Sequence, residues 1–152
     1  MIPIVIDSNL LVATFDPKDV WHKSVLEIDE ALLGFASRVI LDVVVMESVS
    51  VIARRLEEKK QSDRFSEILT ILQAELPTSL IRWISPLIRS SYTECIQLMI
   101  KYDGKLNFND CLIVNYMKKF NVKYIASFDA DFDSVDGVVR ISSVADVHEK
   151  LL

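Results

Sequence analysis

Two acidic side chains follow short apolar runs of the kind that form buried strands. Asp7 follows Ile4–Ile6 in the stretch PIVIDSNLLV, and Asp129 follows Tyr124–Ser127 in the stretch SFDADFD, with Asp131 close behind. A carboxylate at the end of a buried strand costs free energy unless hydrogen bonds or an opposite charge compensate it. Because ligands of open α/β sheets bind beyond the carboxyl ends of the strands, we expect these acids to share one edge of a sheet.

Two further acids lie at the starts of predicted helices. Glu47, in MESVSVIARRL, lies near the first turn of its helix and close to the apolar stripe, with Ser48 facing solvent. The helix dipole favours a negative charge at such a position. Asp110, in NFNDCLIVNYM, follows Asn107 and Asn109, either of which could cap the helix. The residues three, four and seven positions after Asp110 are apolar, so its side chain should point inward over the edge of the sheet.

Each acid taken alone also has a structural interpretation. Asp7 and Asp110 could cap the helices that follow them, and Glu47 could be a favourable charge in a first turn. The stretch DADFDSVDG could be an acidic surface loop. It is not an EF-hand, because Ser134 takes the place of the required glycine and Arg140 that of the bidentate glutamate.

Taken together, the four acids predict a metal site. Two carboxylates ~5 Å apart at an effective dielectric constant of ~20 repel each other by about 3 kcal/mol. Such a cluster must either bind protons or bind a cation. Oxygen ligands with few histidines nearby favour Mg²⁺ or Mn²⁺ over zinc. We therefore expect Asp7, Glu47, Asp110 and Asp129, with Asp131 as an alternative fourth acid, to bind one or two such ions.

The elements that must position these acids alternate along the chain. Five short runs rich in β-branched or aromatic residues are predicted strands: Ile4–Ile6, Val39–Val45, Leu80–Ile84, Tyr124–Ser127 and Val138–Ile141. Longer stretches with helical spacing lie between them, at Met46–Leu56, Ser62–Leu76, Leu87–Tyr102 and Asp110–Phe120. This alternation predicts an α/β fold, a three-layer α/β/α sandwich with a mostly parallel central sheet, formed as one domain over residues 1–152.

Composition excludes several other classes of protein. The formal net charge of −5 argues against non-specific binding of polyanions by the whole surface. The three glycines, Gly34, Gly104 and Gly137, cannot form the glycine-rich loops that bind nucleotides. Two cysteines fit a reducing compartment. No apolar run approaches the ~20 residues of a membrane span, and no secretory signal is present. We expect a cytoplasmic protein that does not enter a membrane.

Four stretches, VIDSNLLV, VVVMESVSV, NFNDCLIV and SFDADF, in this order resemble the PIN-domain nucleases, the fold of the VapC toxins. The resemblance extends from Ile4 to about Val139. It implies that Asp7, Glu47 and Asp110 are core acids and that Asp129, or Asp131, is the fourth. It also matches three small polar residues that would hold Asp7 through hydrogen bonds or flank the last acid: Ser8, Asn9 and Ser127.

The resemblance implies a metal-dependent endoribonuclease that hydrolyses RNA phosphodiester bonds, and the toxin of a VapBC-type pair with an antitoxin partner. A PIN nuclease of RNA maturation or decay without an antitoxin is one alternative, and an inactive PIN-like module that binds RNA or protein is another. The presence of all four acids argues against the inactive module.

The sequence leaves open which residues contact the substrate and which bind partner proteins. Basic residues between the motifs could contact RNA or form solvated helix faces: Arg54, Arg55, Lys59, Lys60, Arg64, Lys101 and Lys105. The apolar stretches FSEILTILQAEL and LIRWISPLI offer more apolar surface than one sheet face can cover. They predict a homodimer or an antitoxin-binding surface.

Overall fold

Five parallel strands form the centre of the protein, which we describe from a computed structural model covering residues 1–152. The order across the sheet is β3-β2-β1-β4-β5, and every neighbouring pair is parallel. The strands are β1 (Ile2–Ile6), β2 (Ala36–Leu41), β3 (Ile81–Arg82), β4 (Tyr124–Ala126) and β5 (Val139–Ile141). This confirms the predicted α/β class and places all five predicted strands in one sheet.

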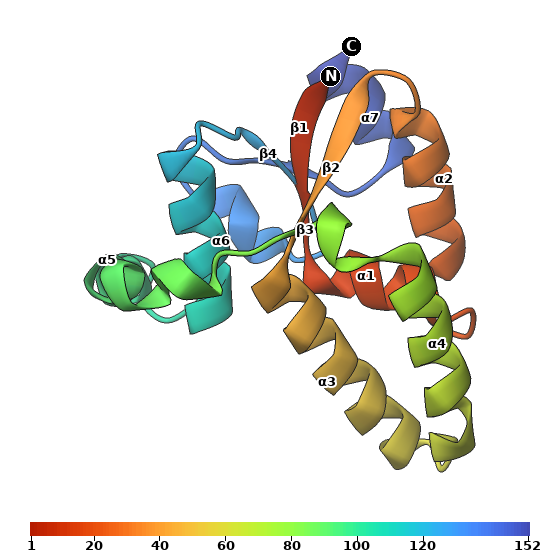
Figure 1. The fold of residues 1–152 in the computed structure, drawn as a ribbon. Coiled ribbons are helices and arrows are strands. Elements are labelled where there is room, and N and C mark those ends of the chain that lie inside the picture. Colours follow the sequence, from red (N-terminus) through yellow and green to blue (C-terminus); the bar gives the residue numbers. More distant parts are fainter.

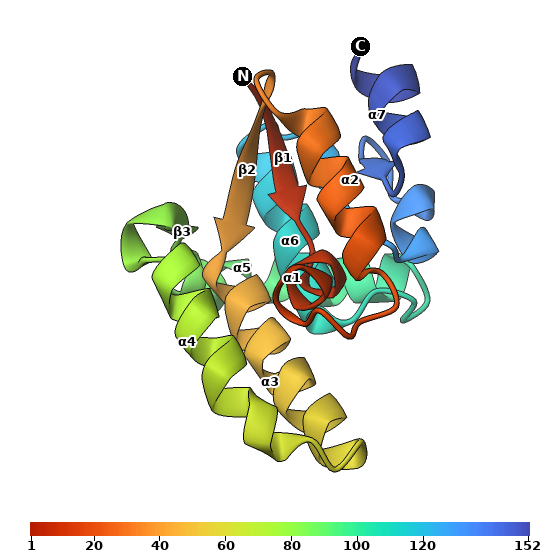
Figure 2. The ribbon, with the colours of Figure 1, turned by 90° about the vertical axis from the view of Figure 1, so that its right-hand side faces the viewer.

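Helices cover both faces of this sheet (Figures 1 and 2). On one side lie α1 (Ser8–Phe15), α2 (His22–Leu32) and α7 (Val144–Leu151), and on the other α6 (Phe108–Lys119) with α5 (Ile88–Lys101) packed against it. The helices α3 (Asp42–Glu58) and α4 (Phe65–Glu75) form a hairpin that projects beyond the carboxyl ends of the strands. Four short 3₁₀ helices complete the chain: η1 (Ser62–Arg64), η2 (Thr78–Leu80), η3 (Ser85–Leu87) and η4 (Ala130–Ser134).

The order of the strands creates a switch point between β1 and β4. The chain moves outward from β1 through β2 to β3, then crosses back by way of α5 and α6 to place β4 on the other side of β1. Crossovers in opposite directions leave a crevice at the carboxyl ends of the two strands, which is where open α/β sheets bind ligands. The residues that follow β1 and β4 are Asp7 and Ser127, and the Asp7 N–H donates to the carbonyl of Ala126 (3.0 Å).

The second strand lies earlier than the sequence predicts, at Ala36–Leu41 instead of Val39–Val45, and α3 begins directly after it. The β-branched run Val43–Val45 forms the first turns of α3 instead of the end of a strand. Asp42 explains this boundary, because its carboxylate accepts hydrogen bonds from its neighbour Val43 N (3.0 Å) and from two N–H groups beyond β3, those of Ile84 (3.0 Å) and Ser85 (3.0 Å). Burial alone would raise the pKa of Asp42, but these hydrogen bonds outweigh it and hold the pKa below its ordinary value.

Glu47 consequently lies in the second turn of α3, and the acid of the first turn is Asp42. The prediction that Ser48 faces solvent is also wrong. Ser48 is 0% exposed, and its hydroxyl donates to the carbonyl of Val44 (2.7 Å), as a buried serine in a helix commonly does.

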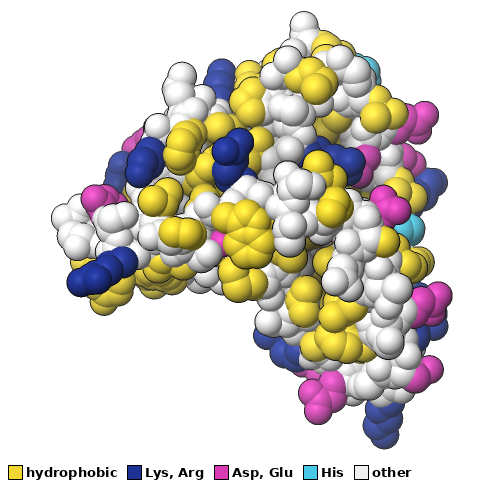
Figure 3. All heavy atoms as spheres, viewed as in Figure 1, with side chains coloured by type: hydrophobic (Ala, Val, Ile, Leu, Met, Phe, Trp, Pro, Cys, Tyr) yellow, Lys and Arg dark blue, Asp and Glu magenta, His cyan; other side chains and the backbone are white.

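One apolar core joins the sheet to its helices, and it includes both cysteines, neither of which is in a disulfide. Some large apolar side chains nevertheless stay exposed, among them Ile71, Leu80 and Trp83. Figure 3 shows apolar side chains in the middle of one face, over β3, and between α3 and α4. None of the helices is both long and apolar enough to cross a membrane.

We expect Asp42→Ala to destabilise the protein by about 2–4 kcal/mol, because it leaves three N–H groups at the junction of β2, α3 and β3 without an acceptor. Denaturant unfolding measures the effect. The exposed Glu57, near the other end of the same helix, provides the control, and Glu57→Ala should change stability by no more than about 0.5 kcal/mol. Equal losses in the two variants would contradict the role given to Asp42.

Candidate active site

Asp7 is the most enclosed acid of the site. It is 3% exposed and lies at the carboxyl end of β1, where it also caps α1 by accepting the Ser8 N–H on Oδ1 (2.7 Å). Its other oxygen, Oδ2, accepts from the Ser127 hydroxyl (2.6 Å) and from the Asn9 side-chain amide (2.8 Å). The helix-capping role considered from the sequence is therefore present, together with a second set of contacts that a cap does not require.

Asn9 and Ser127 tie the ends of β1 and β4 together. The Asn9 amide also donates to Ser127 Oγ (3.2 Å), and its Oδ1 accepts the backbone N–H of Phe128 (3.1 Å). Ser127 Oγ in turn accepts the N–H of Asp129 (3.0 Å). Ser8 contributes through its backbone N–H rather than its hydroxyl. The network fixes the orientation of the Asp7 carboxylate relative to the loop that carries Asp129.

Burial raises the pKa of Asp7 from 3.8 to about 6. The hydrogen bonds from Ser127 and Ser8 oppose this rise, and the negative charges of Glu47 and Asp129 add to it. A carboxylate that is so well hydrogen-bonded would ordinarily ionise easily, so the net rise reflects loss of solvent and crowding by other acids.

Asp110 lies at the start of α6 and faces the same acids. Asn107 is the cap: its side chain accepts the Asp110 N–H (2.9 Å), and Asp110 Oδ2 accepts the Asn107 N–H (2.8 Å), which forms a capping box. Asp110 is 7% exposed, and burial raises its pKa to about 7, with the charges of Asp7, Glu47 and Asp129 contributing in the same direction. Its place on the inward side of the helix agrees with the sequence prediction.

Glu47 supplies a buried oxygen without a partner. Its Oε2 is inaccessible to solvent and accepts no hydrogen bond, and it is the only buried side-chain oxygen or nitrogen of the chain in this condition. A buried acceptor without a donor costs about 1–3 kcal/mol, and more when it is charged. The charge of Glu47 also contributes to the raised pKa values of Asp7 and Asp110, so its carboxylate lies near theirs.

Asp129 lies in the loop after β4, near Asp7 and Asp110. Its charge acts on both Asp7 and Asp110, whereas Asp131 is not among the main influences on either. Asp129 caps η4 by accepting the Asp131 N–H on Oδ1 (2.9 Å). The guanidinium of Arg140 pairs with Asp133 (2.8 Å) and donates to the Ser127 carbonyl (3.2 Å).

The negative charges of these acids raise the pKa values of Asp7 and Asp110, but several of their carboxylate oxygens accept hydrogen bonds from the protein. No group of three Asp, Glu, His or Cys side chains is gathered tightly enough to enclose a metal ion in this arrangement. The side chains nevertheless suit a hard divalent cation, because all of them offer oxygen and one buried oxygen has no donor. A cation would relieve both the mutual repulsion and the orphaned Glu47 oxygen.

Three of the seven basic residues considered as RNA contacts form close ion pairs with acids of the chain. Arg64 pairs with Asp16 (2.8 Å) and Arg55 with Asp19 (2.7 Å), while Lys101 pairs with Asp136 (2.8 Å). The contacts of Arg55 and Arg64 hold the loop between α1 and α2, a function that the sequence analysis did not foresee. The alternation of charges in RRLEEKKQSDR indicated solvated helix faces but gave no sign of these distant partners.

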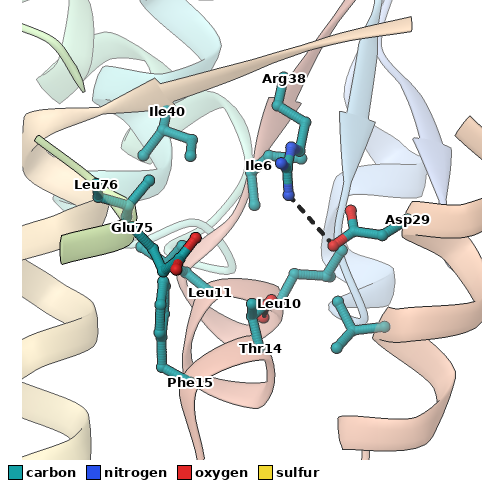
Figure 4. A pocket seen from close by; sticks show the side chains of 11 residues that line it. Ile6, Leu10, Leu11, Thr14, Phe15, Asp29, Arg38, Ile40, Glu75 and Leu76 are labelled. Carbon is teal, nitrogen blue, oxygen red and sulfur yellow. Dashed lines mark hydrogen bonds and ion pairs between the residues drawn. The ribbon is translucent and has the colours of Figure 1, made fainter. Parts of the chain in front are cut away.

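A separate cavity of about 110 Å³ lies on the side of β2 that carries α1 and α2 (Figure 4). The Arg38–Asp29 ion pair (3.3 Å) borders it, and Leu76 closes part of its wall. None of the four acids lines this cavity, so it is distinct from the candidate active site.

A family model described as "PIN domain" matches residues 4–138, which include all four acids. Comparison with curated protein sequences gives no match.

Among solved structures, VapC20 of Mycobacterium tuberculosis, described as a sarcin-ricin loop cleaving toxin, aligns with a TM-score of 0.66 at 18% identity, over 91% of this chain and 98% of that one. A chain of the VapBC2 complex of Rickettsia felis, bound to a DNA fragment from its promoter, aligns with a TM-score of 0.64 at 15% identity, over 92% and 98%. At these identities the likeness is one of fold.

We expect the metal-free protein to lose stability as pH rises from about 4 to 7. Asp7 and Asp110 hold protons more tightly in the folded than in the unfolded chain, so their contribution is full below pH 3.8 and is lost as pH rises through about 6 to 7. The shift of Asp7 alone corresponds to about 3 kcal/mol. Urea unfolding in EDTA across this range measures it, and Asp7→Asn should flatten the curve. A wild-type curve that is flat or rises over this range would refute the prediction.

Proposed function

This chain belongs to the PIN domain family, and from that premise we propose that it is an endoribonuclease that hydrolyses RNA phosphodiester bonds with Mg²⁺ or Mn²⁺. The observation that carries the proposal is the set of buried acids at the β1–β4 switch point. Two of them have raised pKa values, and a third has a buried oxygen without a hydrogen-bond donor. Perturbed acids in one crevice are typical of a functional site.

The four acids would share the work of holding the ion. We assign Asp7 and Asp110 as ligands, directly or through water, because they are the most buried of the four acids and the charge of Asp7 acts on Asp110. Glu47 would turn its free Oε2 to the ion or to the attacking water. Asp129 would help to bind a second ion or complete the ligand set; its position relative to Asp7 and Asp110 favours it over Asp131.

A divalent ion bound here supplies Lewis-acid polarisation of a phosphoryl oxygen and lowers the pKa of a coordinated water. The chain's own residues set the geometry. Asn9 and Ser127 hold Asp7 in one orientation, and the capping box holds Asp110, so neither carboxylate has to be reoriented when RNA binds. The carboxylates also provide acceptors for the proton that the attacking water releases.

We further propose that this nuclease is the toxin of a VapBC-type pair, with an antitoxin protein as its partner. The support is similarity of fold to VapC20 and to the VapBC2 complex. A PIN nuclease of RNA maturation or decay, without an antitoxin, is the alternative. The cytoplasmic location and the homodimer stay predictions.

Asp110→Asn and Asp7→Asn should each reduce cleavage of single-stranded RNA in Mg²⁺ or Mn²⁺ by at least about 100-fold, because each removes a negative ligand from the site. The folded state should remain, since Asn preserves the shape and most hydrogen bonds; circular dichroism checks this. Asp29→Asn is the matched control: Asp29 is also a partly buried acid with a raised pKa, but it faces Arg38 outside the cluster.

The same assay separates the two candidates for the fourth acid. Asp129→Asn should impair cleavage strongly and Asp131→Asn weakly. Undiminished cleavage by both the Asp7 and the Asp110 variants would refute the assigned site, and undiminished cleavage after removal of divalent ions with EDTA would refute the metal dependence.

Expression of the chain in a bacterial host tests the toxin proposal. We expect it to arrest growth, because uncontrolled RNA cleavage stops protein synthesis, and we expect Asp7→Asn to abolish the arrest. Co-expression of the product of an adjacent small gene should restore growth. Colony counts measure both effects. Growth that is unaffected by an active, soluble enzyme would favour a role in RNA maturation or decay.

A further inference from the structure

A stacked pair of aromatic side chains lies directly beside the acid cluster. The ring centroids of Trp21 and Phe128 are 4.7 Å apart, and their planes are inclined by 19°. Phe128 stands between Ser127 and Asp129, and its N–H donates to Oδ1 of Asn9, the residue whose amide binds Asp7. The pair is therefore attached to the network that positions the acids.

Trp21 remains exposed in spite of this stacking. It is 48% exposed, and its indole nitrogen makes no hydrogen bond within the chain, whereas that of Trp83 donates to the carbonyl of Thr78 (3.2 Å). A tryptophan that served only to fill the core would be buried, with its N–H bonded. Phe128 supports the indole on one side and leaves much of the ring to solvent.

The loop that carries Trp21 is held firmly. Asp16 and Asp19, whose side chains are almost fully buried, pair with Arg64 and Arg55, and Asp19 Oδ1 also accepts the Trp21 N–H (2.8 Å). These contacts fix an exposed aromatic residue in one place. A surface that is ordered before its ligand arrives loses less entropy on binding.

A free cation, Lys18, lies in the same loop as Trp21 and could contact a phosphate of a nucleic acid. Lys18, three residues earlier in the same loop, is exposed and forms no ion pair with the chain's acids. Proteins that bind single-stranded nucleic acids combine such cations, which contact phosphates, with aromatic rings on which bases stack.

We propose that Trp21, supported by Phe128, is the platform on which an unpaired base of the RNA stacks, next to the phosphodiester at the acid cluster. This inference rests on the proposed nuclease function and adds to it a side chain that contacts a base of the substrate. Only bases free of a duplex expose their faces to an aromatic side chain.

Fluorescence tests the contact without requiring cleavage. The chain contains two tryptophans, so Trp83→Phe leaves Trp21 as the single indole. We expect short oligoadenylate RNA to quench its emission, and an abasic oligomer of the same length and charge to leave it unchanged. The abasic oligomer separates base stacking from attraction to phosphate.

Cleavage kinetics give the second readout. Trp21→Ala should raise KM by about 5- to 100-fold, the equivalent of one stacked base, with a smaller effect on kcat. Trp21→Phe should restore most of the loss because it retains an aromatic face. Trp83→Ala is the control: Trp83 is 52% exposed but follows the edge strand β3, on the opposite side of β1 from β4.

The outcomes separate this inference from the function on which it rests. Quenching by oligoadenylate without cleavage under any divalent ion would support the platform and overturn the nuclease proposal. Cleavage with unchanged KM in Trp21→Ala and no quenching would overturn the platform alone. Emission that responds to protein concentration but not to RNA would also overturn it, because Trp21 would then lie in a contact between chains.

Discussion

The crowding of buried and half-buried carboxylates at the carboxyl ends of the strands is the constraint on which the site depends. Asp7, Glu47, Asp110 and Asp129 come from four distant parts of the chain and meet where the direction of strand addition reverses. Burial, with a smaller contribution from the neighbouring negative charges, raises the pKa values of Asp7 and Asp110 and so makes their ionised forms costly. Buried acids with perturbed pKa values are typical of functional sites. A divalent cation bound among them would stabilise their ionised forms.

The fold also limits how far the carboxylates can move. Asp7 is held by Ser127 and Asn9, which join β1 to β4, and Asp110 is held by the cap of α6. Glu47 differs, because it lies within α3 and one of its oxygens has no donor. Among these three of the four acids, we therefore interpret two carboxylates as fixed and one as adjustable. Such a site can bind an ion with little rearrangement of the backbone.

Ion pairs elsewhere serve the site indirectly. Arg55 and Arg64 belong to the α3–α4 hairpin, yet they neutralise acids of the loop between α1 and α2. That loop places Trp21 against Phe128, beside Asp129. Acid–arginine pairs in which the acid is buried lose solvation and add little net stability, so we interpret these two pairs as positioning the loop. Arg55 and Arg64 thus fix the loop between α1 and α2. In our proposal, the aromatic pair that this loop positions contacts the substrate.

The sequence by itself determined the α/β class, the existence of the five strands, and the strand ends and helix starts at which the acids lie. It could do so because burial patterns and helix starts are local properties. It also identified Asn107 as one of two possible caps of α6. Three features were decided only by tertiary structure. The end of β2 depends on Asp42, whose partners Ile84 and Ser85 lie some forty residues further along the chain. The burial of Ser48 follows from the earlier start of α3. The stacking of Trp21 on Phe128 joins residues more than one hundred positions apart, and no local pattern can indicate such a contact.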